Sequence, residues 1–235
     1  MSEAAPSRLD DYLDVFVSPT ALFTRRSDGK FGQALLVLVI LSAILFFATK
    51  SAMAPIMDAE MAKGMAGAMK ANPNMTPEQI ESAKAIGAKF ASVGFIFILI
   101  VAPFLLGTVI FLASRVAGGA VGFAQGITIA TFAWFPRLVE GVVSAVQALL
   151  MDESQLTSRL SVSLGLGRLM DAATTNPYVL ALAGRVDVFT LWVTALIAIG
   201  IKVMAKVSTA QAVGAAAVVW FIGAIPVLLQ AMRQG

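Results

Sequence analysis

One arginine and one glutamate have the spacing that best suits proton or ion chemistry in this 235-residue sequence. Arg137 and Glu140 directly follow Pro136, and residues three apart lie on one face of a helix, where they can pair. Ser144 and Gln147 continue this polar stripe along an otherwise apolar segment. Ionisable groups at membrane depth are costly and often line pathways, so the stripe is compatible with a water-filled path. An interfacial or structural ion pair is the commoner role of such residues.

Methionines recur at every fourth position between residues 53 and 69, and thioether ligands favour Cu(I). However, the sequence contains no Cys and no His, which are the usual soft-metal ligands and, for His, the commonest general base. We therefore interpret these methionines as a flexible apolar seam and expect no metal, cofactor or catalytic site. The seam comprises Met53, Met57, Met61, Met65 and Met69.

The N-terminal segment predicts a short amphipathic helix. Its apolar face comprises Leu9, Tyr12, Leu13, Phe16 and Val17. Asp10, Asp11 and Asp14 lie on the other face, and Ser18-Pro19 is typical of the cap and first residue of a further helix. Helices on membrane surfaces are normally basic, so the carboxylates indicate contact with a protein partner. The simpler alternative is a helix that only covers the cytoplasmic end of a bundle.

Long uncharged runs make up most of the remaining sequence. The chain is 58% hydrophobic and 13% charged, whereas soluble domains carry about 25% charged residues. Five runs suit membrane spans, at about residues 31–50, 90–114, 117–136, 187–207 and 208–232. Asp187 and Lys202 bracket the fourth span and are interpreted as marking its ends, and the helix can continue to about Val207 only if Lys202 extends toward a headgroup. We predict an all-α integral membrane bundle, residues 31–235, after a cytoplasmic segment, residues 1–30.

The segments between spans predict two further features. Asn72-Pro73-Asn74 and the capping box Thr76-Pro77-Glu78-Gln79 indicate an extracytoplasmic helical hairpin at about 51–89. Ile80, Ala83, Gly87 and Phe90 are expected to meet the methionine seam. A straight helix from 117 to 150 would be about 51 Å long, so we expect a break near Pro136 and outer loops over about 137–186. Whether residues 137–151 are interfacial or embedded is left open.

Basic residues predict the orientation of the chain. Three groups fall on one side when the spans alternate, and that side is expected to be the cytoplasm: Arg25, Arg26 and Lys30; Arg115; Lys202 and Lys206. The odd number of spans then places the C-terminus outside. The net charge of +3 forms no stripe that could follow phosphates, so nucleic acid is not an expected partner.

Three motifs occur at intervals along the chain: Val15-Phe16-Val17-Ser18-Pro19, the 72–79 segment and Asp187-Val188-Phe189-Thr190-Leu191-Trp192. Together they resemble the Yip family of Ypt/Rab-interacting proteins, in its bacterial branch. The resemblance covers nearly the whole chain and implies five spans with a cytoplasmic N-terminus and no established catalytic residue. Eukaryotic members are associated with Rab GTPases and vesicle traffic. This chain has only about 30 residues before its first span, which favours a bacterial cytoplasmic membrane.

We therefore expect a non-enzymatic membrane protein that organises membrane or protein partners. The expected partners are the lipid bilayer and a protein that contacts Asp10, Asp11 and Asp14, and homo-oligomerisation is left open. The alternative function is a small-molecule, ion or lipid transporter that uses the broken third span with Arg137 and Glu140 beside the path. A metal-handling role for the methionines is a third hypothesis.

Overall fold

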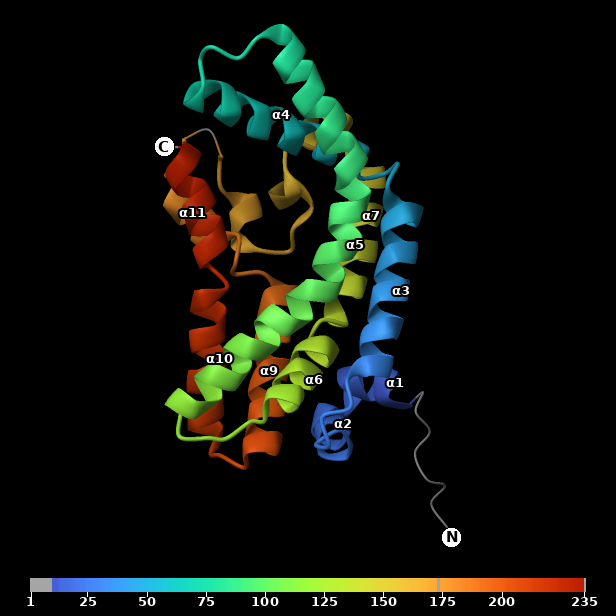
Figure 1. Ribbon diagram of the computed structural model, residues 1–235, viewed down its shortest axis with the longest axis vertical. Helices are drawn as coiled ribbons and strands as arrows, with labels where there is room; N and C mark the ends of the chain where they lie inside the picture. Colours follow the sequence, from blue (N-terminus) through green and yellow to red (C-terminus); the bar gives the residue numbers. More distant parts are fainter. Residues whose placement is uncertain (1–9, 173, 235) are drawn as a thin grey trace. The chain divides into compact units, whose positions relative to one another are not determined.

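The computed structural model describes residues 10–172 and 174–234, and these are helical apart from turns, loops and one isolated bridge, Gly165 to Asp187 (Figure 1). Leu9, assigned to the apolar face of the N-terminal helix, lies outside this part of the chain. The helices are α1 (Asp10–Val17), α2 (Pro19–Arg25), α3 (Gly32–Thr49), α4 (Ala54–Ala71), α5 (Pro77–Val116), α6 (Phe123–Ala133), α7 (Pro136–Leu150), α8 (Pro177–Ala183), α9 (Val188–Ala205), α10 (Thr209–Ile222) and α11 (Ile225–Gln234). Three short 3-10 helices lie between α7 and α8: η1 (Glu153–Gln155), η2 (Arg159–Val162) and η3 (Leu166–Leu169).

Five helical stretches are long and apolar enough to cross a membrane, which confirms the predicted all-α membrane bundle. They are Gly32–Thr49, Val93–Val116, Phe123–Leu150, Val188–Ala205 and Thr209–Met232. The third stretch differs from the expected 117–136. It begins later because Gly118, with φ +79°, turns the chain after α5. It ends later because Pro136 occupies the first position of α7, where a missing N–H is tolerated, so helix resumes where an outer loop was expected.

The described chain divides into two compact units. Unit 1 comprises the chain up to Ile40, then Val101–Val139 and Phe189–Gly223. Unit 2 comprises Leu41–Ile100, Glu140–Val188 and the chain from Ala224. Residues 10–30 therefore belong to the same unit as the first part of α3.

Unit 1 is built around α6, whose residues Gly126 to Ala133 are all buried. A Cβ atom placed on Gly107 of α5 would lie 2.7 Å from the Cα of Ile127, and one placed on Gly126 would lie 2.5 Å from the Gly107 carbonyl oxygen. The two backbones therefore touch at this pair of glycines. Such close approach is how helices gain van der Waals contact in a bilayer, where hydrophobic association is weak.

Unit 2 has a small core formed by α4, α7 and the 3-10 helices. Ile56, Ala148, Leu156 and Val162 are buried there, and Met53 packs against them. The Gln147 side chain of α7 donates a hydrogen bond to the Val162 carbonyl at 2.9 Å and accepts one from Arg168. Gln147, which the sequence placed on a polar stripe, therefore holds the loop after α7.

The helical pair α4 and α5 is joined by a turn at the predicted position. Thr76 and Gln79 form the capping box, since the Thr76 N–H donates to Gln79 Oε1 at 3.0 Å and the Gln79 N–H to Thr76 Oγ1 at 3.3 Å. The methionine seam does not close along its length. Met61 and Met69 are 41% and 45% exposed, and no atom lies within 4 Å of a Cβ placed on Gly87.

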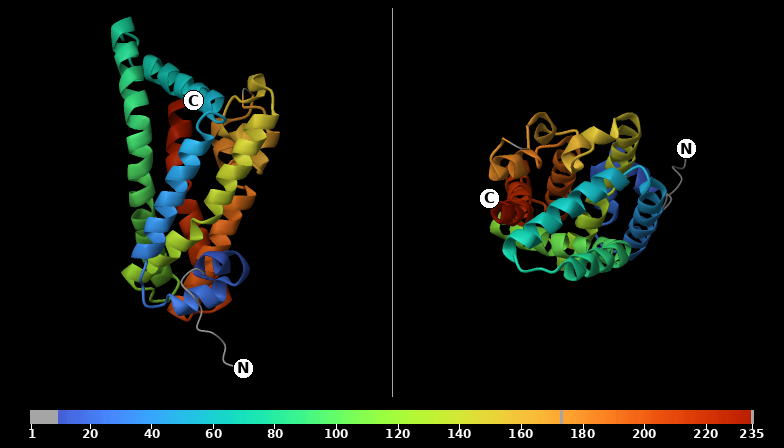
Figure 2. Two further views of the ribbon diagram at one scale, coloured as in Figure 1. Left: turned by 90° about the vertical axis from the view of Figure 1, so that its right-hand side faces the viewer. Right: turned by 90° about the horizontal axis from the view of Figure 1, so that it is seen from above.

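Figures 1 and 2 show why the seam stays open: α4 lies at a steep angle to the part of α5 in the same unit, residues 77–100, instead of alongside it. Alanine and glycine occupy much of α4, so close packing there would bury little apolar area. Ala83 is likewise exposed, and the side chain of Phe90 lies outside the described side chains.

Replacing Gly107 with alanine is expected to lower the free energy of unfolding by about 1–3 kcal/mol, because the new methyl group must displace the backbone of α6. Gly94→Ala on the same helix is the matched control, since nothing lies within 4 Å of its Cβ position. Thermal unfolding in detergent micelles measures both. Equal stability of the two variants would contradict the close packing of α5 on α6.

Candidate functional site

Residues 10–30 form a folded N-terminal cap in which α1 and α2 meet at Ser18. The Ser18 N–H donates to the Asp14 carbonyl at 2.8 Å, and the Leu22 N–H donates to the Ser18 carbonyl at 3.2 Å. Pro19 is the first residue of α2, as predicted, whereas the Ser18 side chain makes no capping hydrogen bond. The break at Ser18-Pro19 lets the C-terminal end of α2 return to the acidic residues of α1.

Two aspartates and two arginines form an ion-pair cluster inside the N-terminal cap. The Asp11 side chain is only 3% exposed, and its carboxylate accepts from Arg25 Nη2 at 2.8 Å and from Nε at 3.2 Å. Arg26 donates to the other Asp11 oxygen, and Arg25 Nη2 reaches Asp14 Oδ2 at 2.5 Å. A buried carboxylate is tolerable only when paired in this way, so the cluster neutralises itself within the chain.

The electrostatics of the N-terminal cap follow from these pairs. Hydrogen bonding to Asp11 raises the pKa of Arg25 above its ordinary value. Burial, followed by the nearby Asp11 charge, raises the pKa of Tyr12, so its hydroxyl stays neutral at physiological pH. The hydrogen bond from Lys30 lowers the pKa of Asp28, whose carboxylate lies 3.0 Å from the Lys30 ammonium.

Aromatic contacts and one amide fix the N-terminal cap to the helices of unit 1. The Tyr12 ring lies 5.5 Å from that of Phe135, and the Phe16 ring meets Trp192 edge-on at 5.6 Å between centroids. The Gln125 side chain of α6 donates to the Ser27 carbonyl at 2.6 Å. The N-terminal cap is therefore part of the packed unit, in addition to being closed by ion pairs.

The outward side of α1 is apolar. Leu13 and Val17, four residues apart, are 68% and 76% exposed. Of the predicted partner contacts, Asp11 is buried, while Asp10 and Asp14 are half-buried. The sequence reasoning missed Arg25 and Arg26 as internal partners. The sequence did contain an indication of this pairing. Acidic residues precede Ser18-Pro19 and two arginines follow it, so a turn at this point brings the opposite charges together.

The candidate polar residues of the spans are distributed between the two units. In unit 1, Arg137 Nη2 donates to Thr190 Oγ1 of α9 at 2.9 Å, and Thr190 is buried. Lys202 is exposed and lies twelve residues beyond Thr190, about 18 Å along the helix, so it is remote from Arg137. In unit 2, Glu140 is half-buried in the first turns of α7, and the buried Asp187 forms the bridge to Gly165.

The Yip1 domain family model matches residues 13–230. The chain belongs to the Yip1 family. The match confirms the predicted resemblance and covers most of α1, together with α2 and all five candidate spans. Neither the comparison with curated proteins nor that with solved structures gave a match.

Asp11→Asn is expected to destabilise unit 1 by about 3 kcal/mol, because Arg26 loses its carboxylate partner and Arg25 keeps only Asp14 in a partly buried site. Asp28→Asn removes an exposed ion pair and is expected to change stability by less than about 0.5 kcal/mol. Chemical unfolding followed by tryptophan emission reports both changes through Trp192. An Asp11→Asn protein as stable as the Asp28→Asn protein would show that the buried cluster contributes nothing.

Proposed function

We propose that this Yip1-family membrane protein is a non-enzymatic organiser whose N-terminal cap binds a protein partner at the cytoplasmic surface. The observation that carries the proposal is the exposure of Leu13 and Val17 on a helix that is otherwise anchored by ion pairs and aromatic contacts. Large apolar side chains exposed side by side on a fixed helix are typical of interaction surfaces.

The internal pairing of Asp11 supports this proposal in energetic terms. An isolated helix of eight residues is not stable in water, so α1 depends on its contacts with Arg25, Arg26 and the aromatic side chains. Because the helix is already ordered, a partner gains contacts with Leu13 and Val17 without the entropic cost of folding it.

The chemistry of α1 defines the partner that would fit. Leu13 and Val17 match the i, i+4 anchors of a helix that lies in an apolar groove. Asp11 and Asp14 are already paired with Arg25 and Arg26, so the exposed apolar pair is what a partner would recognise.

The proposal includes the predicted orientation, with the N-terminus in the cytoplasm, the C-terminus outside and the hairpin at about 51–89 extracytoplasmic. It also includes a bacterial cytoplasmic membrane as the location. Arg115, Lys202 and Lys206 support this orientation, since they lie in or beside the short connections after α5 and α9.

A photo-crosslinking amino acid at Leu13 or Val17 is expected to capture a specific protein in native membranes. The same amino acid at Thr20, which is exposed on α2, is the positional control. Capture from position 17 should fall at least several-fold when Leu13→Asp is introduced, because the apolar anchor is lost. Adducts with lipid alone, or equal capture from position 20, would contradict a protein contact on α1.

Transport remains the second candidate function, because the third span breaks just before Pro136 and Arg137 lies half-buried beside it. Under the proposed function, vesicles containing the purified protein are expected to leak protons and small ions no faster than empty vesicles. Flux above that of empty vesicles, reduced by Glu140→Gln, would instead establish a path along α7.

A further inference from the structure

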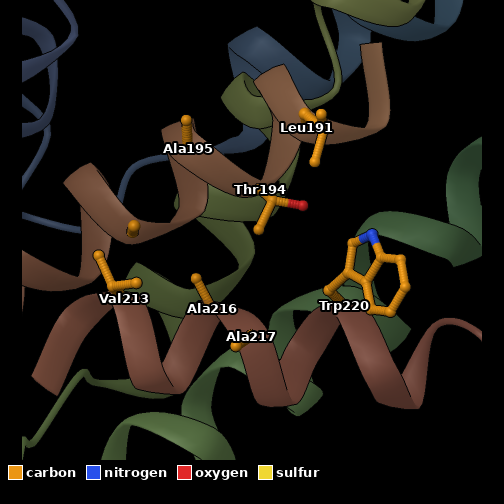
Figure 3. A pocket seen from close by; sticks show the side chains of 8 residues that line it. Leu191, Thr194, Ala195, Val213, Ala216, Ala217 and Trp220 are labelled. Atoms are coloured by element: carbon orange, nitrogen blue, oxygen red, sulfur yellow. The ribbon is translucent and has the colours of Figure 1, made fainter. Parts of the chain in front are cut away.

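A groove runs between α9 and α10 on the surface of unit 1 (Figure 3). Its volume is about 370 Å³. Leu191 and Trp220 stand at one end of the groove, Val213 lies toward the other, and Ala216 and Ala217 lie between them on α10. The groove exists because alanines on both helices leave space that the larger side chains at its ends do not fill.

The groove can hold only an apolar molecule. Both helices belong to candidate membrane spans, whose expected surroundings are hydrocarbon. The one hydroxyl in the lining, that of Thr194, already donates to the Thr190 carbonyl at 2.7 Å. No charged side chain lines the groove itself.

A positive charge continues the groove along α9. Lys202 follows Leu191 by eleven residues and Ala195 by seven, so all three lie on one face of the helix. The rise from Leu191 to Lys202 is about 16 Å. The face therefore runs from Lys202, three residues before the end of the candidate span Val188–Ala205, to Leu191, three residues after its start.

The charge beside the groove has no counterion nearby in the described chain. Lys202 and Lys206 are exposed, and among the described residues no carboxylate lies within 4 Å of either. The stretches 101–139 and 189–223, which supply most of unit 1, contain no Asp or Glu. The Gln211 side chain donates to the Ala117 carbonyl at 3.0 Å, so the first turn of α10 packs beside the turn that follows Arg115.

We propose that an anionic phospholipid binds this groove, with one acyl chain between α9 and α10 against Trp220 and its phosphate at Lys202 and Lys206. The charge selects this occupant over a zwitterionic lipid. It also selects it over a helix of a second copy, since the five candidate spans carry one carboxylate between them, Glu140.

Quenching of Trp220 by lipids with brominated acyl chains tests the proposal. The protein is reconstituted with brominated phosphatidylglycerol or brominated phosphatidylcholine of the same chain length, and the Trp220 contribution is obtained by difference from Trp220→Phe. Phosphatidylglycerol is expected to occupy the groove about fivefold more strongly per contributing lysine. Equal quenching by the two lipids would overturn the proposal, because it would show only bulk lipid at Trp220.

Charge variants test the role of the lysines. Lys202→Gln together with Lys206→Gln should abolish the preference for phosphatidylglycerol, and Lys202→Arg should keep it. Lys50→Gln, at an exposed lysine after α3, is the matched control and should also keep it. Glycerol 3-phosphate should not displace the brominated lipid. A preference that survives the double substitution, or displacement by the free phosphate, would overturn the assignment.

A bulky substitution that fills the groove tests independently whether the acyl chain lies there. Ala195→Phe should reduce quenching by brominated phosphatidylglycerol several-fold, while Ala48→Phe, at an exposed alanine of α3, should leave it unchanged. Thermal unfolding confirms that both variants are folded. Unchanged quenching in a folded Ala195→Phe protein would show that the acyl chain does not lie between α9 and α10.

Discussion

The contact between the backbones of α5 and α6 is the constraint on which unit 1 depends. Lipid tails are as apolar as leucine, so helices in a bilayer associate through packing and local hydrogen bonds. Gly107 and Gly126 remove the side chains that would hold α5 and α6 apart, and α6 becomes buried from Gly126 to Ala133. Because α6 is central, other elements of unit 1 contact it, including Tyr12 at Phe132 and Ser27 at Gln125.

Unit 1 contains charged side chains in two different environments. In the N-terminal cap, Asp11 and Asp14 are satisfied by Arg25 and Arg26, so an apolar pair is what α1 presents outward. Beside the groove, Lys202 and Lys206 are exposed on stretches without any carboxylate. The first arrangement suits recognition of a protein through apolar contacts, and the second suits recognition of an anion at a membrane surface.

The spans could be predicted from the sequence because run length alone decides whether a helix crosses lipid. Four of the five candidate spans lie close to their expected positions. The third does not, since the turn at Gly118 and the resumption of helix at Pro136 depend on tertiary packing. The ion pairs of the N-terminal cap could not be predicted in this way. They form only because α2 folds back onto α1, and the spacing of residues along one helix does not reveal that contact. The groove could not be predicted either, because it forms between two helices. The alanines of each helix alone resemble an ordinary helix–helix contact face.

The ion-pair cluster also separates two stages in the life of the chain. Before the helices pack, Arg25 and Arg26 are free to act as the flanking cations that the insertion machinery senses, and aspartates have little influence at that stage. After packing, the same guanidinium groups hold Asp11 and Asp14. With the proposed orientation, the same two arginines act first as flanking cations during insertion and then as partners of the aspartates in the folded cap.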